Sequence, residues 1–212
     1  MRIDVDGLSG QEAYKLITGS IVPRPIALVT TVNEAGVVNA APFSFFNAFA
    51  GRKPRVGLGV GEREPGTPKD TAKNIRSQGE FVVHIVDEPL AERMNLCAVP
   101  FPPEVSEIEA AGLSVEPSHY VKPPRISASP IHMECALLKE VDIDSETVLF
   151  VGKVLCFHVR PDLYSGGRID PHRLRAVGRL AGSTYSYTRD LFQMERLSYE
   201  DWLRGPGAGV NR

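Results

Sequence analysis

The sequence predicts a mainly β protein, a β-barrel with a few peripheral helices. Two long segments, 131–141 and 148–159, are rich in β-branched and aromatic residues, as expected of barrel strands. Segment 21–31 is apolar and is followed by turn residues at 33–36 and a second extended stretch, which predicts a hairpin. At 212 residues the chain is long enough to bury a sizeable core, and we expect one domain over residues 1–212.

Helices are predicted at four places between the strands. Residues 10–18 form the first, with Ala13, Leu16 and Ile17 spaced to face a core. The others are expected at 69–77, at 89–96, and from Pro103 to a C-terminal cap at Gly112.

Two segments are expected to be irregular. The stretch 116–130 contains several prolines and serines, which predicts a loop that lies over a pocket or over a partner subunit. The tail from about residue 205, GPGAGVNR, is expected to be disordered.

The charge balance argues against nucleic acid and membrane partners. Lys and Arg total 24 against 26 for Asp and Glu, so the overall field does not favour a polyanion. No apolar run reaches the ~18 residues of a membrane span, and the charged start MRIDVDGLSG lacks the apolar core of a signal peptide. We therefore expect a cytoplasmic protein.

Residues 39–50, NAAPFSFFNAFA, combine small and hydroxylic residues with phenylalanines directly after a turn. Short side chains at Asn39, Ala40 and Ala41 keep the backbone N–H groups accessible, while Pro42 stiffens the bend and Ser44 offers a further hydrogen-bonding group. Such a segment is a plausible cradle for a flat, polar-edged cofactor. The alternative is an ordinary strand whose small residues allow close packing.

The strand RVGLGVG at 55–61 has a face without side chains. Gly57, Gly59 and Gly61 alternate with apolar residues, so they share one side of the strand. Its spacing differs from the dinucleotide-binding fingerprint. The bare face either admits a ring or substrate, or lets another backbone pack closely, and close packing is the favoured interpretation.

Four motifs, in order along the chain, are PRPIALVTT, NAAPFSFFN, KDTAKNI and EFVVHIV, and the series continues through GLSVEPS, PRISASPIHMEC, TVLFVGKV and RLAGSTY. Together they cover the chain from about Ala13 to about Tyr187, and in this order and spacing the chain resembles the FMN-binding split-barrel flavoproteins of the flavin reductase and flavoredoxin type. The resemblance implies a split-barrel fold, bound FMN, and a homodimer with the flavin at the subunit interface.

FMN would need donors for its phosphate and polar groups along the ring edge. Lys69 and Thr71, at a predicted helix N-terminus, and Arg179 are the candidates for the phosphate. For the ring, the resemblance suggests Thr30, Thr31, Asn39 and the backbone around Ala40, Ser44 and Phe45. Three nearby assignments stay open: Lys69 as a solvated surface lysine, Asp70 as a helix cap, and Arg24 as a partner of either a carboxylate or the phosphate.

The cysteines and histidines show no established catalytic or metal-binding pattern. Cys135 and Cys156 lie in apolar strands and are expected to be buried, whereas Cys97 is expected to be more accessible. His132 and Glu134 share one face of a strand, where a surface pair is the simplest interpretation; the alternative is that His132 approaches flavin or substrate. No catalytic residue is identified, which suits an oxidoreductase whose cofactor carries the chemistry.

The leading functional hypothesis is therefore an oxidoreductase in which NADH or NADPH reduces bound FMN, with electrons passed to free flavin or another acceptor. The segment LYSGGRIDPHRL at 163–174 lacks the GDH-type signature of many dedicated flavin reductases, which puts nicotinamide use in question. The alternatives are a flavoredoxin-like electron carrier to a redox protein and a flavin-binding module without turnover. Partners are thus small-molecule donors and acceptors or a redox protein.

Overall fold

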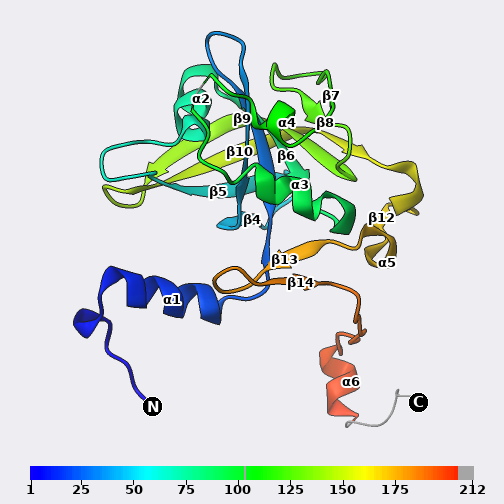
Figure 1. Cartoon of the computed structure of the whole chain (residues 1–212). Coiled ribbons are helices and arrows are strands. Elements are labelled where there is room, and N and C mark those ends of the chain that lie inside the picture. The colour runs from blue at the N-terminus through cyan, green and yellow to red at the C-terminus, as the bar shows by residue number, and fades with distance from the viewer. Residues whose placement is uncertain (103, 205–212) are drawn as a thin grey trace.

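The computed structural model describes residues 1–102 and 104–204 and is dominated by one curled antiparallel sheet (Figure 1). Its seven strands lie in the order β3-β2-β6-β9-β10-β5-β4. The mainly β prediction is confirmed. The strands are β2 (Ala27–Val32), β3 (Val38–Phe43), β4 (Phe46–Ala48), β5 (Arg55–Gly61), β6 (Glu80–Ile85), β9 (Ile131–Asp142) and β10 (Thr147–Val159).

Three smaller sheets lie at the margins of this half-barrel. The three-stranded sheet pairs a short strand that precedes the barrel strands in the sequence with two strands that follow them. A second small sheet is a hairpin that begins at Val115 and occupies much of the predicted loop 116–130. The strands are β1 (Arg24–Pro25), β13 (Val177–Arg179) and β14 (Tyr185–Tyr187) in the first sheet, β7 (Val115–Glu116) and β8 (Arg125–Ile126) in the second, and β11 (Tyr164–Ser165) and β12 (Arg168–Ile169) in the third.

The helices are short and peripheral, and three of the four predicted ones form as expected. The fourth is shorter than predicted because a turn, in which Val105 N–H bonds to the carbonyl of Pro102, precedes it; Pro103 and the tail 205–212 lie outside the described residues. The helices are α1 (Gly10–Ser20), α2 (Asp70–Gln78), α3 (Ala91–Leu96), α4 (Glu107–Ala110), α5 (Pro171–Leu174) and α6 (Tyr199–Leu203), with 3-10 turns η1 (Val5–Gly7), η2 (Glu88–Leu90) and η3 (Pro161–Leu163). Of the helices described, none is long and apolar enough to cross a membrane.

The core is divided between the two faces of the sheet. Successive strand residues point to opposite faces, so Val29 and Leu28 of β2 belong to different apolar clusters. One cluster fills the barrel around Phe81 and Phe150, and the other packs β2 and β3 against α3, α4 and β8. Both faces of β2 are therefore buried, which agrees with a sequence, ALVTTV, that has no charged residue.

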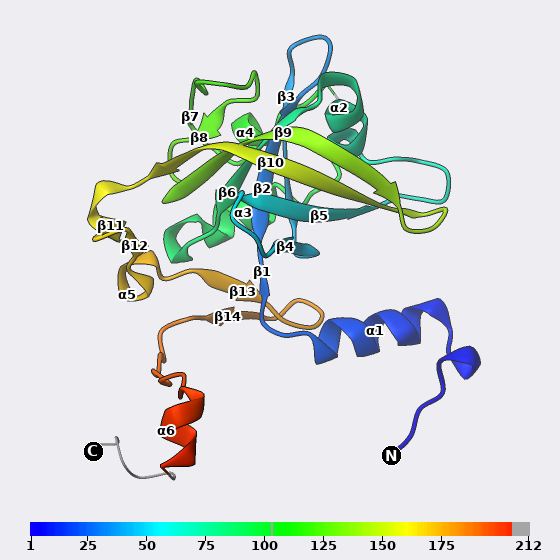
Figure 2. The same cartoon turned by 180° about the vertical axis from the view of Figure 1, so that it is seen from behind.

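Helix α1 does not pack into this core. Its start is well specified, because Ser9 and Glu12 form a reciprocal capping box. Leu16 and Ile17 are nevertheless 42% and 49% exposed, so the prediction that they face a core is wrong within this chain. In both views α1 and α6 project from the barrel beyond the β13–β14 hairpin (Figures 1 and 2).

The C-terminal segment is also apolar and exposed. Phe192 and Met194 each expose 82% of their surface, and Trp202 exposes 63%. Two exposed apolar arms thus leave the same side of one barrel (Figure 2), an arrangement typical of surfaces that bind another molecule.

Candidate functional site

A cleft of about 480 Å³, the main cleft, opens between helix α1, the β3–β4 bend and the loop after β13. Residues distant in sequence line it: Tyr14, Arg24, Ser44, Phe45, Lys69 and Arg179. A second space of about 330 Å³, the side hollow, lies on the other side of Lys69 and includes Asn39 and Thr71. The two share Phe43, Glu62 and Lys69 on their walls, so they are neighbours.

Arg24 is a structural residue at the end of the main cleft. Its side chain is buried and donates to the carbonyls of Thr18 (2.6 Å), Ile21 (2.9 Å) and Leu180 (3.0 Å). Its Nε also lies 3.4 Å from Ser44 Oγ. Among the described residues, backbone carbonyls and not a carboxylate are the partners of the guanidinium, so the carboxylate interpretation is wrong. Arg24 thereby fixes α1 and the loop after β13 against the bend that carries Ser44. Arg24 also lines the main cleft, and the phosphate interpretation stays a prediction.

The aromatic wall of the main cleft comes from Phe45, at the β3–β4 bend. The residue is 47% exposed, and the Arg24 guanidinium carbon and the Tyr14 ring centroid lie 5.8 Å and 6.3 Å from the centroid of its ring. Behind it, Gly59 N–H donates to the carbonyl of Phe45 at 2.7 Å. Phe45 therefore offers an apolar surface whose backbone is fixed by β5.

The glycine face of β5 allows this close approach. A Cβ on Gly59 would lie 3.1 Å from the Cβ of Phe45, and one on Gly57 would lie 2.8 Å from the ring of Phe49. Close packing of another backbone, the favoured interpretation, is therefore confirmed for Gly59, whereas the close neighbour of Gly57 is a side-chain ring. Gly59 and Gly61 also line the main cleft. The absence of side chains on this face of β5 therefore allows the close contacts and also leaves room in the cleft.

Lys69 stands at the N-terminus of α2 and borders both spaces. It is half-buried, its Nζ lies 5.6 Å from the centroid of the Phe43 ring, and no carboxylate lies within 4 Å of it in the part of the chain that the structure describes. Burial, with a smaller contribution from the nearby Arg63, lowers the pKa of Lys69. A cation with this environment favours a bound anion.

Asp70 is the first helical residue and not the cap that was expected, because Lys69 occupies the cap position. Its carboxylate accepts from Arg63 at 2.9 Å and from Lys73 at 3.1 Å. These two cations neutralise Asp70, so the positive end of the helix dipole is left near Lys69.

Arg179 lies on the opposite wall of the main cleft. Its guanidinium lies over the ring of Tyr185 at 4.6 Å and donates to the Tyr185 hydroxyl and to the carbonyl of Gly182. The side chain is partly exposed, and its remaining donors have no partner in the part of the chain that the structure describes, so a ligand in the main cleft can meet them.

Thr31, Asn39 and Thr71 come together, as a polar network behind the main cleft. Asn39 Nδ2 donates to Thr71 Oγ1 at 3.0 Å, and Asn74 Nδ2 donates to Thr31 Oγ1 at 3.0 Å. Thr31 and Thr71 are buried, so they position α2 against β2 and β3. Only Asn39 and Thr71 reach a wall, that of the side hollow.

Thr30 and Ala40 lie away from both spaces. Thr30 is fully buried and donates to the carbonyl of Pro124 at 2.7 Å. Ala40 is also fully buried, in the core cluster behind β3, and its N–H donates to Glu107 at 2.9 Å. The expectation that Ala40 faces the cleft is wrong, because strand alternation turns its methyl group inward and Glu107 uses its N–H.

The burial of Cys97 and Cys156 is the reverse of the expectation. Cys97 is 2% exposed, and burial raises its pKa to about 12, whereas Cys156 is partly accessible. Cys135 is buried as predicted. His132 and Glu134 are both buried, so the surface-pair interpretation is wrong; a covering loop, 116–126, lies over that face of the strand.

Sequence reasoning missed Tyr14, Glu62 and Tyr185, which line the main cleft. Tyr14 belongs to the predicted helix 10–18, and Tyr185 is the last residue of the motif RLAGSTY, so both lie in segments that the sequence analysis identified. Nothing in the local pattern placed either of them beside Ser44 or Phe45.

Comparisons with known proteins all point to one family. The flavin reductase like domain family matches residues 18–173. An uncharacterised protein of Halalkalibacterium halodurans is 44% identical over 92% of this chain and 96% of its own length.

Solved structures agree with this family. Nitrilotriacetate monooxygenase component B from Bacillus cereus is 39% identical with a TM-score of 0.87, covering 92% of this chain and 98% of its own. The 2-nitrobenzoate 2-nitroreductase of Pseudomonas fluorescens is 36% identical with a TM-score of 0.87, covering 99% and 100%. A flavoredoxin of Desulfovibrio vulgaris shares the fold, with a TM-score of 0.75 at 16% identity over 94% of this chain and 100% of its own. The chain belongs to the flavin reductase-like family of split-barrel flavoproteins and is an oxidoreductase of that type.

Proposed function

We propose that the main cleft holds FMN and that NADH or NADPH reduces it, with electrons passed on to free flavin or another small acceptor. The observation that carries this proposal is Lys69, a half-buried cation at the start of a nine-residue helix, without a carboxylate partner among the described residues and on the wall of both spaces. A phosphate is the anion that helix N-termini commonly bind.

The residues present fit FMN. Lys69 and the first N–H groups of α2 would hold the phosphate, with Arg179 as a second cation, and Phe45 and Ser44 would hold the ring. A volume of about 480 Å³ lies within the usual range for small-molecule sites. When bound, FMN supplies hydride acceptance and one- or two-electron donation.

The role of the chain's own residues is to bind the flavin and to fix its orientation. Phe45 excludes water from one side of the cleft, and Arg24 keeps Ser44 at its edge through the 3.4 Å contact. Thr71 accepts a hydrogen bond from Asn39, so its own hydroxyl proton is available to a ligand in the side hollow. No side chain is required to act as a nucleophile.

We also propose a homodimer. Tyr14 belongs both to the main cleft and to the exposed apolar face of α1 with Leu16 and Ile17. A second copy that covers this face would close the cleft as well, and a two-fold pair would create two equivalent sites. The exposed C-terminal segment supplies further apolar surface for the same contact.

The test is the visible spectrum of the purified protein, followed by rapid mixing with NADH and with NADPH. An oxidised-flavin spectrum that bleaches with either nucleotide, and that recovers when free FMN or an aromatic nitro compound is added, supports the proposal. Bound flavin that neither nucleotide bleaches, but that dithionite reduces and an oxidised redox protein then reoxidises, would favour the electron-carrier alternative. A protein that binds no flavin would refute the site.

A further inference from the structure

The pairing of three adjacent strands gathers metal-ligating side chains on the face of the sheet under the covering loop. β6, β9 and β10 lie side by side, and their register aligns His84, His132 and His158 in one row. In the next row Glu134 of β9 pairs with Cys156 of β10. Directly paired residues of antiparallel strands share a face, so these side chains lie on one side of the sheet.

A β-bulge is responsible for the composition of this face. Val154 pairs with Cys135 and Cys156 pairs with Glu134, so Leu155 is the extra residue between them. Without it, strand alternation would place Leu155 opposite Glu134 and turn Cys156 to the other face.

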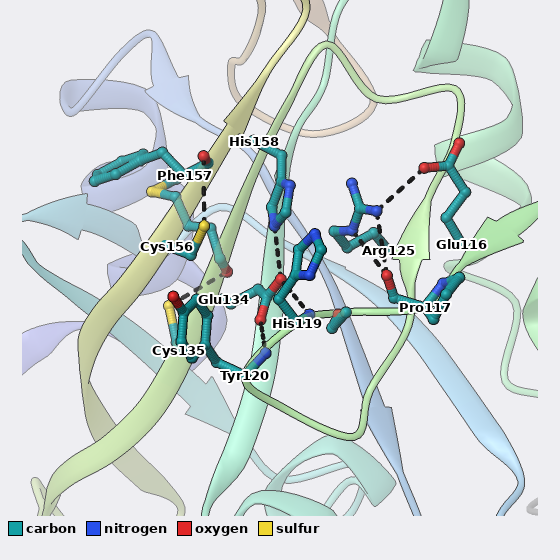
Figure 3. A network of polar contacts seen from close by, with 12 residues as sticks. Glu116, Pro117, His119, Tyr120, Arg125, Glu134, Cys135, Cys156, Phe157 and His158 are labelled. Atoms are coloured by element: carbon teal, nitrogen blue, oxygen red, sulfur yellow. Dashed lines mark hydrogen bonds and ion pairs between the residues drawn. The ribbon is translucent and has the colours of Figure 1, made fainter.

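We propose that Glu134, Cys156 and His158 form a binding site for a divalent transition metal ion, with Zn²⁺ as its best match. One ligand atom of each residue lies within 4.8 Å of the other two. His158 Nε2 is 2.6 Å from Glu134 Oε1 (Figure 3). Thiolate, imidazole and carboxylate are the three ligand types of Zn²⁺ sites, and a thiolate disfavours Mg²⁺ and Ca²⁺.

The surroundings of Glu134 resemble the outer shell of a metal site. Glu134 is fully buried, and its two oxygens accept the N–H groups of His119 at 2.9 Å and Tyr120 at 2.6 Å (Figure 3). Such bonds fix the orientation of a ligating carboxylate. A fully buried carboxylate also favours a nearby cation, since burial alone would penalise its charge.

The site is accessible from solvent and leaves a position open. The side chain of His158 is 17% exposed, and Cys156 is partly accessible. The ring of His119 stacks on that of His158 at 5.3 Å, within the covering loop. The fourth position of a tetrahedral ion is therefore open to water.

The polar groups of this face are also incompletely satisfied. His132 donates from Nε2 to the carbonyl of Ile126 at 2.8 Å, which leaves its buried Nδ1 without a partner among the described residues. Its ring centroid lies 6.0 Å from that of His158. A buried acceptor without a donor is uncommon in native proteins and favours an additional polar species nearby.

Metal binding requires two proton changes. The thiol proton of Cys156 leaves to solvent, and His158 offers its Nε2 lone pair once its ring carries its proton on Nδ1. The ion then takes the place of the hydrogen bond between His158 and Glu134. It connects β9 to β10 and, through Glu134, to the covering loop. None of the three ligands lines the main cleft or the side hollow, so this site is separate from the proposed flavin site.

The experiment measures Zn²⁺ content and affinity directly. The full-length protein is incubated with Zn²⁺, dialysed and analysed for bound metal per chain, and its affinity is measured by competition with a chromophoric chelator. We expect one Zn²⁺ per chain, and an affinity at least about tenfold lower in Cys156→Ser and in His158→Gln. Cys135→Ser, next to Glu134 but on the opposite face of β9, is the matched control and should retain wild-type affinity.

Co²⁺ provides a second measurement that does not depend on affinity. A thiolate-to-cobalt charge-transfer band should be present in the wild type and in Cys135→Ser and absent in Cys156→Ser, with circular dichroism to show that each variant is folded. Wild-type protein that keeps no stoichiometric Zn²⁺ would overturn the proposal. So would equal Zn²⁺ affinity in Cys156→Ser and the wild type, because binding would then be to other surface groups.

Discussion

Replacing Lys69 with Met should weaken the binding of FMN far more than that of riboflavin. Met keeps the apolar part of the side chain, so packing against Phe43 is largely retained and the main loss is the charge. FMN and riboflavin share the ring and differ in the phosphate. The difference between their affinities therefore isolates the interaction with the phosphate.

The structure sets the expected magnitude. The ammonium of Lys69 is already half-desolvated and has no carboxylate partner among the described residues, so a phosphate would not have to displace one. A hydrogen bond to a charged group contributes about 1.5 to 3 kcal/mol, which corresponds to about a 10- to 150-fold weaker Kd for FMN. Riboflavin has no phosphate, so the substitution should cost its binding free energy less than about 0.7 kcal/mol. Its affinity should therefore change by no more than about threefold.

The assay is a fluorescence titration of apoprotein with each flavin. Lys73→Met is the matched control, since Lys73 lies on the same helix but is exposed and already paired with Asp70 at 3.1 Å. Burial lowers the pKa of Lys69, so FMN affinity should also fall as the pH rises through that lowered value, while riboflavin affinity should not. Equal losses for both flavins in Lys69→Met would show that Lys69 does not contact the phosphate.

Three further outcomes follow from the structure. Ala40→Leu should destabilise the fold by about 1 to 3 kcal/mol in urea unfolding, because the larger side chain overpacks a fully buried position; a stable variant that has lost its flavin would instead place Ala40 in the cleft. Ile17→Asp should lower the association constant of the proposed dimer, and added FMN should raise that of the wild type, as measured by sedimentation across a dilution series; a flavin-bound monomer at all concentrations would refute the interface site. Burial lowers the pKa of His84 to about 3, so the unfolded chain binds this proton first and stability should fall by about 1.4 kcal/mol per pH unit as the pH drops from 6.5 towards 3. His84→Asn should show a shallower decline in urea unfolding over that range, and parallel curves would mean that the folded protein does not hold His84 neutral.

Strand positions were predictable from the sequence because their signal is local. The segment 131–141 was predicted and β9 covers Ile131–Asp142, since β-branched and aromatic residues fit a pleated, half-buried surface. Helix α2 was predicted within a residue at each end, and in the structure Gly79 ends it in the left-handed conformation. These features depend only on neighbours in the sequence.

The side of a strand or helix on which a residue lies was harder to predict than the position of that strand or helix in the sequence. The bulge at Leu155 shifts alternation by one residue, so Cys156 was assigned to an apolar, buried position that it does not occupy. Helix periodicity likewise identified the apolar face of α1 correctly, but periodicity does not tell whether that face packs against its own chain or against another. Both errors arise from contacts that no local pattern encodes.

The cations of the candidate site show the same limit, because the sequence does not reveal which groups already bind each of them. From the sequence, Lys69 was the leading candidate for the phosphate, Arg179 a second one, and Arg24 an open assignment. Their roles differ because of what already satisfies each one. Arg24 uses most of its donors on Ser44 and on three backbone carbonyls, one of them 156 residues away in the sequence, so little of its hydrogen-bonding capacity remains for a phosphate. Arg179 uses part of its capacity on Tyr185 and Gly182. Lys69 has no such partner among the described residues and stands at a helix N-terminus, so an anion bound there gains the full interaction without replacing another.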